Sequence, residues 1–156
     1  MRPGDQARAG GDDGLIRHDL DVALVNGLLQ ERHLAVLATH RKDGGILLSP
    51  IWYRWENERI HVGILAGDIK LRHISRNPNV TVVVAEEDPP YRGFEVRGVA
   101  HPNDADFPPA MRQIARRYLG PIGDALYRDH PQGSVVDEPI ASRSWDFADD
   151  MGEAAG

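Results

Sequence analysis

The feature that most constrains the fold is a series of short apolar segments between residues 34 and 98, the first three of which are separated only by tight turns. The segments Leu34–His40 and Ile46–Trp55 flank the turn RKDGG, and Asp-Gly-Gly is a strong hairpin signal. A second short turn leads into Arg59–Leu65. Because no helix separates these three predicted strands, a doubly wound parallel sheet is excluded.

Helical segments are predicted before and after these strands. Leu20, Leu24 and Leu28 recur at every fourth position, which predicts an amphipathic helix that ends just before the first strand. The segment Ile69–Ser75 also has helical spacing, and the Asn-Pro pair that follows ends it. Apolar residues at helical spacing over Met111–Leu119 predict a longer helix that ends at Gly-Pro.

Three further strands complete the β-rich pattern. Val80–Ala85 is almost wholly apolar, which predicts a strand buried on both faces. Tyr91–His101 alternates apolar with charged residues, as expected for a strand with one face in water. Ile140–Phe147 is the predicted last strand, and Ile122–Asp129 is a candidate short helix before it. Successive strands with flanking helices predict an α+β, mainly β protein built on a closed antiparallel barrel.

The chain of 156 residues is long enough for one domain. Residues 1–17 are rich in Gly, Asp and Arg and are predicted to form a disordered tail. The folded domain is predicted to span residues 18–147, and residues 148–156 are predicted to form an acidic tail. The chain shows no internal repeat.

Charge and composition restrict the class of function. A formal net charge of −6 argues against broad nucleic-acid binding, which needs a basic face. No apolar run approaches the ~20 residues that a membrane-spanning helix requires, so no membrane partner is expected. The chain has no cysteine, which excludes a disulfide framework and thiolate chemistry. Together with a first segment that lacks a secretory apolar core, this predicts a cytoplasmic protein.

Over residues 20–147 the order and spacing of several motifs resemble the FMN-binding split barrel, or pyridoxamine 5′-phosphate oxidase-like, superfamily. Within it, the sequence is most similar to the branch that uses the deazaflavin coenzyme F-420. The resemblance rests on Leu28–Gly45, Pro50-Ile51-Trp52, Lys70-Leu71-Arg72, Arg76-Asn77-Pro78, Pro90-Tyr91-Arg92, Glu95-Val96-Arg97-Gly98 and Ser144-Trp145-Asp146-Phe147.

The resemblance implies an antiparallel split barrel of about six strands with flanking helices, assembled as a homodimer. It implies that a cofactor lies in a groove between two barrels and supports hydride transfer to a conjugated small-molecule substrate. The expected activity is that of an F-420-dependent oxidoreductase. An FMN-dependent oxidase or reductase of the same fold is the alternative.

The resemblance also implies roles for individual residues. Lys70 and Arg72 are expected to hold the anionic tail of the cofactor, since a cation beside a short helix forms an anion site. Trp52 is expected to line the place of the flat ring. Tyr91 and Arg92 are expected to reach the cofactor from the partner chain. The full expected cofactor-binding set is Pro50, Ile51, Trp52, Ala66, Gly67, Ile69, Lys70, Leu71, Arg72, Pro90, Tyr91 and Arg92.

The sequence departs from the family pattern beside the expected anion site. In relatives the stretch before this lysine, Lys70, often carries a Ser or Thr and a basic residue, whereas here it has Gly63, Ile64 and then Asp68. His73 takes the place of a common Asn. A carboxylate next to a phosphate is unfavourable unless it points away or binds a cation. A second alternative is therefore a non-catalytic protein that binds a cofactor, haem or a small apolar ligand.

The sequence assigns no catalytic residue and no metal site. Tyr53, Tyr91 or a bound water are the candidates for a proton donor. The seven histidines do not show a paired metal-binding spacing. In the haem alternative, His40, His61 or His73 is the candidate axial ligand.

Overall fold

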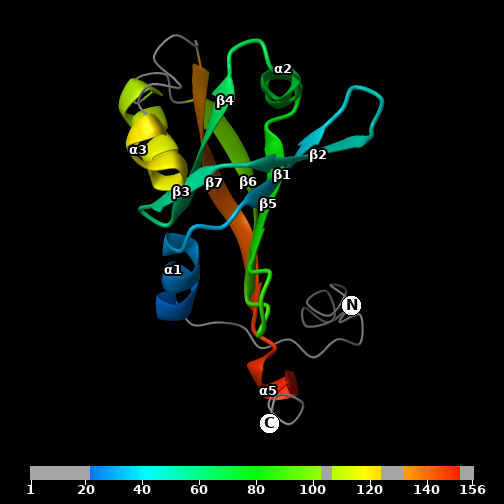
Figure 1. The fold of residues 1–156 in the computed structure, drawn as a ribbon. Helices are drawn as coiled ribbons and strands as arrows, with labels where there is room; N and C mark the ends of the chain where they lie inside the picture. The colour runs from blue at the N-terminus through cyan, green and yellow to red at the C-terminus, as the bar shows by residue number, and fades with distance from the viewer. Residues whose placement is uncertain (1–21, 103–106, 124–131, 152–156) are drawn as a thin grey trace, which may run out of the picture.

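The computed structural model describes residues 22–102, 107–123 and 132–151 (Figure 1). The predicted tail of residues 1–17 and most of the candidate helix Ile122–Asp129 lie outside these residues. The elements are α1 (Val22–Gln30), β1 (Ala35–His40), β2 (Ile46–Ile51), β3 (Tyr53–Glu56), β4 (Arg59–Leu65), α2 (Ile69–Arg76), β5 (Asn79–Ala85), β6 (Gly93–Pro102), α3 (Phe107–Leu119), a 3-10 turn (Gly120–Ile122), β7 (Gln132–Trp145) and α5 (Ala148–Met151).

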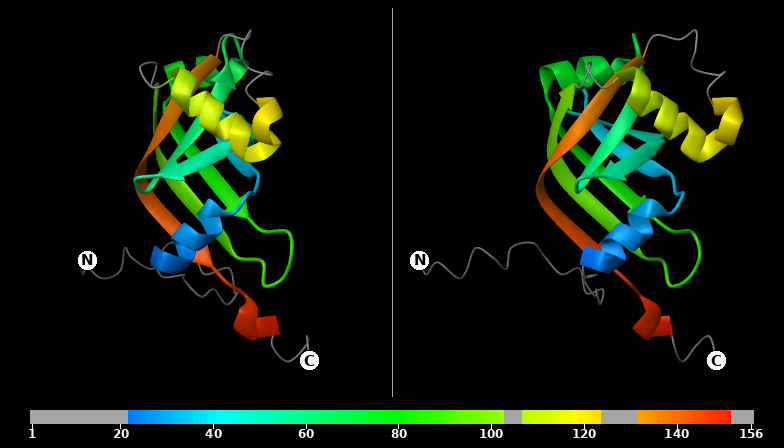
Figure 2. Two further views of the ribbon diagram at one scale, coloured as in Figure 1. Left: turned by 60° about the vertical axis from the view of Figure 1, so that its left-hand side comes forward. Right: turned by 90° about the vertical axis from the view of Figure 1, so that its left-hand side faces the viewer.

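All strand pairs are antiparallel, and the strands follow the order β2-β1-β5-β6-β7-β4-β3 in one curled sheet (Figure 2). The two edge strands, β2 and β3, are neighbours in the sequence and are separated by Trp52 alone. The barrel is therefore split between strands that the chain itself connects. This arrangement confirms the predicted α+β split barrel, with seven strands over the described residues.

The prediction of one strand over Ile46–Trp55 is wrong, because its two halves pair with different neighbours. Residues up to Ile51 pair with β1, whereas those from Tyr53 onward pair with β4. Buried and more exposed side chains continue to alternate where the pairing changes from β1 to β4. The local sequence pattern therefore does not reveal the change of partner strand. The predicted hairpin between β1 and β2 is confirmed by the pairing of His40 with Ile46.

Two other strands differ from their predicted form. β5 buries Val80, Val82 and Val84, but the side chains between them are half-buried, so only one face is fully covered. β7 begins at Gln132, well before the predicted Ile140, and this length lets it pair with both β6 and β4. Its early part lacks the apolar alternation that would have marked it in the sequence.

The helices cover the barrel at three places. α3 packs on β3, β4 and β7, α1 packs near β3, and α2 lies against β1 at the end of the barrel opposite α1 (Figure 1). α1 buries Leu28 and Leu29, but Leu24 is 48% exposed, so the predicted apolar face is only partly correct. No helix of the described ranges is long and apolar enough to cross a membrane, and the cytoplasmic location stays a prediction.

Tyr53 joins the start of β3 to α1 and α3. Its side chain is fully buried, and its hydroxyl donates to the carbonyl oxygens of Leu29 at 3.0 Å and Glu31 at 3.3 Å. The Arg117 guanidinium lies 4.9 Å from its ring centroid, and the Tyr118 hydroxyl accepts from its backbone N–H at 3.3 Å. Burial raises the pKa of Tyr53, which makes this phenol a structural group and a poor proton donor.

We expect Tyr53→Phe to lower the free energy of unfolding by about 1 kcal/mol, because a buried hydrogen bond is lost while Arg117 still donates to the Leu29 carbonyl. Urea unfolding at pH 7 measures the change. Tyr91→Phe is the matched control, since Tyr91 is 41% exposed and should leave stability unchanged. Equal stability of the two variants would contradict this role of Tyr53.

Candidate functional site

A groove lies where β2 ends and α2 begins, and it contains four of the expected cofactor-binding residues. It has a volume of about 240 Å³ and is called here the β2–α2 groove. Pro50, Ile51, Trp52 and Lys70 line it together with Leu34, Gly63, Ile64, Leu65, Asp68, Met111 and Ile114. The chain thus places an indole and an ammonium group in one concave site.

The Trp52 ring is held in place by α3. It stacks on the Tyr118 ring with centroids 5.1 Å apart and planes 6° from parallel. The Tyr118 hydroxyl donates to the His33 carbonyl at 2.6 Å, which fixes the position of the stacked pair. A preorganised aromatic wall of this kind suits a flat ligand, because little side-chain freedom remains to be lost on binding.

Asp68 and Lys70 form a closed pair at the N-terminus of α2. One Asp68 carboxylate oxygen accepts the Lys70 backbone N–H at 2.9 Å and caps the helix, while the other accepts from Lys70 Nζ at 2.8 Å. Partial burial tends to raise the pKa of Asp68, but the hydrogen bonds from Lys70 outweigh it and hold the pKa below its ordinary value. The Asp68 carboxylate, which was predicted to oppose a phosphate, is therefore bound to Lys70, the cation expected to bind that phosphate.

The outer side of α2 forms a second depression of about 590 Å³, and Asp68 borders both hollows. Gly67, Ile69, Leu71 and Arg72 line it, together with Asp68, His73, Ser75 and Arg76. Arg72 and Arg76 are exposed there, so this side of α2 is basic. Ala66 is exposed in the turn that leads into the helix.

His73 is buried beneath α2. The side chains of His73 and Thr39 share a hydrogen bond of 2.9 Å between Nδ1 and Oγ1, which connects α2 to β1. Desolvation, followed by the charges of Arg76 and Arg41, lowers the pKa of His73. The ring is therefore neutral at pH 7 and serves as a link between the helix and the barrel.

Pro90, Tyr91 and Arg92 do not join the groove within one chain. They lie in the turn between β5 and β6, at the end of the barrel opposite α2 (Figures 1 and 2). The Arg92 guanidinium donates to Glu86 at 2.7 Å and to Glu31 at 3.0 Å and lowers the pKa of both carboxyls. These two glutamates and His33 offer atoms within 4.8 Å of one another, but Arg92 already supplies the positive charge that they need.

Comparison with known proteins identifies the family. The sequence profile described as pyridoxamine 5′-phosphate oxidase matches residues 23–145. The chain belongs to this family. The predicted resemblance to the split-barrel superfamily is thereby confirmed. No curated protein matches the sequence significantly.

Several solved structures have a similar fold. A conserved hypothetical protein from Mycobacterium tuberculosis is 23% identical with a TM-score of 0.69, covering 82% of this chain and 86% of that one. An F-420 reductase is 27% identical with a TM-score of 0.61, covering 75% and 94%. The haem storage protein from Vibrio cholerae is 19% identical with a TM-score of 0.65, covering 80% and 94%. This fold thus occurs both in an F-420 reductase and in a haem storage protein.

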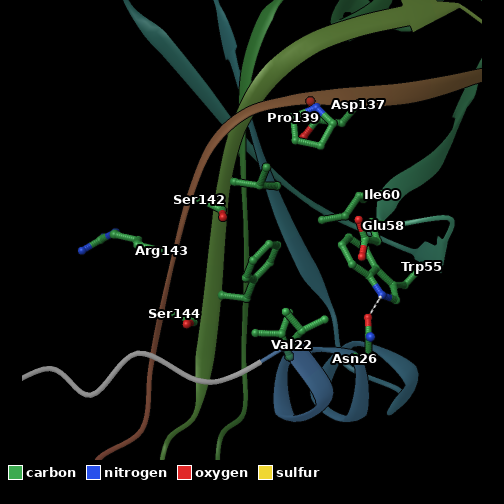
Figure 3. A pocket seen from close by; sticks show the side chains of 13 residues that line it. Val22, Asn26, Trp55, Glu58, Ile60, Asp137, Pro139, Ser142, Arg143 and Ser144 are labelled. Atoms are coloured by element: carbon green, nitrogen blue, oxygen red, sulfur yellow. Dashed lines mark hydrogen bonds between the residues drawn. The ribbon is translucent and has the colours of Figure 1, made fainter.

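A further pocket, which the sequence did not predict, lies inside the barrel at the end near α1 and is called the barrel-end pocket (Figure 3). It has a volume of about 420 Å³. Its walls come from α1, β3, the start of β4, β6 and β7. Near α1, the Trp55 indole N–H donates to Asn26 Oδ1 at 2.7 Å.

Asp137 of β7 lines this pocket and is only 5% exposed. Neither of its carboxyl oxygens has a hydrogen-bond partner among the described residues. Burial raises the pKa of Asp137 to about 7, although the nearby His101 opposes the increase. Gly98, which lies at a register shift in β6, makes room for the carboxyl, since a side chain at this position would collide with it. Only the flanking apolar pair Val135-Val136 hinted at a buried position in the sequence.

We expect the free energy of unfolding to fall between about pH 4 and 7 by up to roughly 4 kcal/mol through Asp137 alone. Its carboxyl has an ordinary pKa of 3.8 and a folded pKa of about 7. In this interval the unfolded chain has released a proton that the folded protein keeps, so rising pH favours unfolding until the folded pKa is passed.

Denaturant unfolding of the wild type and Asp137→Asn over pH 4–8 measures this contribution as the difference between two curves. Other carboxyls affect both proteins alike and cancel. The variant should gain relative stability as pH rises and then keep a constant advantage. Parallel curves would show that Asp137 has an ordinary pKa.

Proposed function

We propose that the protein is an oxidoreductase that binds coenzyme F-420 in the β2–α2 groove and delivers hydride to a conjugated small molecule. The observation that carries this proposal is that one groove contains both Lys70 and Trp52, whose ring is fixed by stacking on Tyr118. An aromatic plane and a cation are the two features that a ring-bearing, phosphorylated cofactor requires.

The ring-binding side of the groove suits this cofactor. Pro50 and Ile51 extend the apolar surface beside Trp52. The chemistry of hydride transfer belongs to the cofactor when it is bound, and the role of these residues is to position its ring and exclude water. The buried hydroxyl of Tyr53 is engaged with backbone carbonyls and does not serve as proton donor.

The anion-binding side suits the cofactor less strongly because of Asp68. A lysine ammonium has three donors, and Asp68 takes one, so Lys70 retains capacity for an anionic tail. The pair as a whole is neutral, however, and the net attraction must come from Arg72 and Arg76 on the outer side of α2. We infer that Asp68 weakens the binding of the tail without preventing it.

The comparisons support a flavin-type cofactor without selecting one. The F-420 reductase is 27% identical over most of its length. The fold alone is also that of a haem storage protein, so cofactor choice depends on the residues around the groove. FMN is the alternative cofactor, and the closed Asp68–Lys70 pair is the observation that favours a non-catalytic ligand-binding role.

We expect F-420 to bind, Lys70→Ala to weaken binding by about tenfold or more, and Asp68→Asn to strengthen it several-fold. Asparagine keeps the helix cap but removes the charge that neutralises Lys70. Titrations of F-420 and, separately, FMN followed by fluorescence polarisation give the dissociation constants. Glu87→Gln makes the same charge change on an exposed turn and is the control.

Tighter binding of FMN would replace F-420 as the cofactor but leave the groove assignment intact. Binding that is insensitive to both Lys70→Ala and Asp68→Asn would refute the anion site. If neither cofactor binds even to Asp68→Asn, the oxidoreductase proposal is wrong.

We also propose that the groove is completed by a second copy of the chain. A volume of about 240 Å³ is below the 300–1,000 Å³ typical of ligand sites, so one chain offers only part of a cofactor pocket. Leu34 and Leu65 line the groove yet are 55% and 50% exposed, and Ile46 and Leu48 are exposed on the same face of β2 as Pro50. Apolar side chains gathered at a groove are typical of an interface.

We expect Leu48→Glu to convert a dimer into a monomer, because it places a charge in the apolar interface. Light scattering coupled to size-exclusion chromatography gives the mass directly. Ile140→Glu is the control, since Ile140 is equally apolar and 70% exposed on β7. A monomeric wild type, or a dimer that persists in Leu48→Glu, would contradict this interface.

A further inference from the structure

The barrel-end pocket is separate from the proposed cofactor site. Among the residues that the structure describes, it shares no lining residue with the β2–α2 groove or with the depression on α2. Its volume of about 420 Å³ falls within the range of small-molecule sites. Most of its lining is apolar or aromatic, including Val25, Ile60 and Val96.

The pocket has a fixed aromatic corner. Trp55 and Phe94 meet edge to face, with centroids 5.8 Å apart and planes at 71°. Asn26 binds the indole N–H of Trp55 and so holds the ring against the pocket (Figure 3). Aromatic faces of this kind attract organic cations as well as apolar groups.

The charged groups of the pocket are mainly acidic. The Asp137 carboxyl is buried and has no hydrogen-bond partner among the described residues, and the exposed Glu58 also lines the pocket. Arg143 also borders the pocket, but its side chain points away and donates to Glu95 at 2.7 Å (Figure 3). A buried acceptor without a donor is costly, so the site favours a molecule that brings one.

We propose that the barrel-end pocket binds a small organic amine, with its apolar body against Trp55 and Phe94 and its protonated nitrogen on the Asp137 carboxylate. The occupant must carry a donor for Asp137 and an apolar surface for the rest of the lining. An anion is disfavoured by both acidic residues. A purely apolar molecule would leave Asp137 unpartnered.

The test uses 2-phenylethylamine as probe, with 2-phenylethanol and 3-phenylpropionate as neutral and anionic analogues of similar shape. Binding is followed by NMR on the indole N–H signals, which are few because the chain has three tryptophans. The Trp55 signal should shift and saturate with the amine. The Trp52 signal reports on the other groove and should not move.

We expect the amine to bind at least about tenfold more tightly than the alcohol, and the propionate not to bind. Asp137→Asn should remove the preference for the amine, while Glu87→Gln should retain it. Ser142→Phe, which fills the pocket from an exposed position, should abolish binding of both amine and alcohol. F-420 affinity should be the same in the wild type and Asp137→Asn, so this inference and the proposed function fail separately.

The inference is overturned if the amine and the alcohol bind equally, if neither shifts Trp55, or if Asp137→Asn binds the amine as the wild type does. The last two results would indicate that water alone satisfies the carboxyl. Asp137→Asn is expected to be as stable as the wild type or more so above pH 7, so its loss of preference for the amine cannot be attributed to unfolding.

Discussion

The buried hydroxyl of Tyr53 connects the parts of the molecule on which the groove depends. The chain passes from one sheet edge to the other at Trp52. The next residue, Tyr53, forms hydrogen bonds to the end of α1 and to Tyr118 of α3. The same Tyr118 stacks on Trp52. One cluster of contacts therefore determines where the barrel splits, where α3 packs and how the Trp52 ring is oriented in the groove.

Local signals in the sequence predicted the elements that local chemistry controls. The hairpin at Asp43-Gly44-Gly45 and the short helix that begins at Ile69 follow from turn residues and spacing, and both are present. The break at Trp52 and the early start of β7 depend on which strands pair across the sheet. Pairing of distant segments leaves no mark in a local pattern, which is why these two features were missed.

The candidate site shows the same division. The sequence singled out Lys70 and the conflict with Asp68, but only the fold reveals that the two side chains bind each other. It predicted that Tyr91 and Arg92 reach the cofactor from a partner chain, and this stays a prediction; within one chain they lie at the other end of the barrel, with Arg92 paired to two glutamates. Asp137 gave no functional signal because its significance depends on the fold: its carboxyl lines a pocket formed by five elements and has no hydrogen-bond partner among the described residues.

The position of Pro50 affects the exposed edge of the sheet. β2 is an edge strand, and an exposed edge invites the addition of further strands from other molecules. Proline carries no N–H and is tolerated in a sheet where that missing donor faces away from the ladder. The outer edge of β2 therefore has an interrupted row of donors, which hinders the open-ended addition of strands from other molecules.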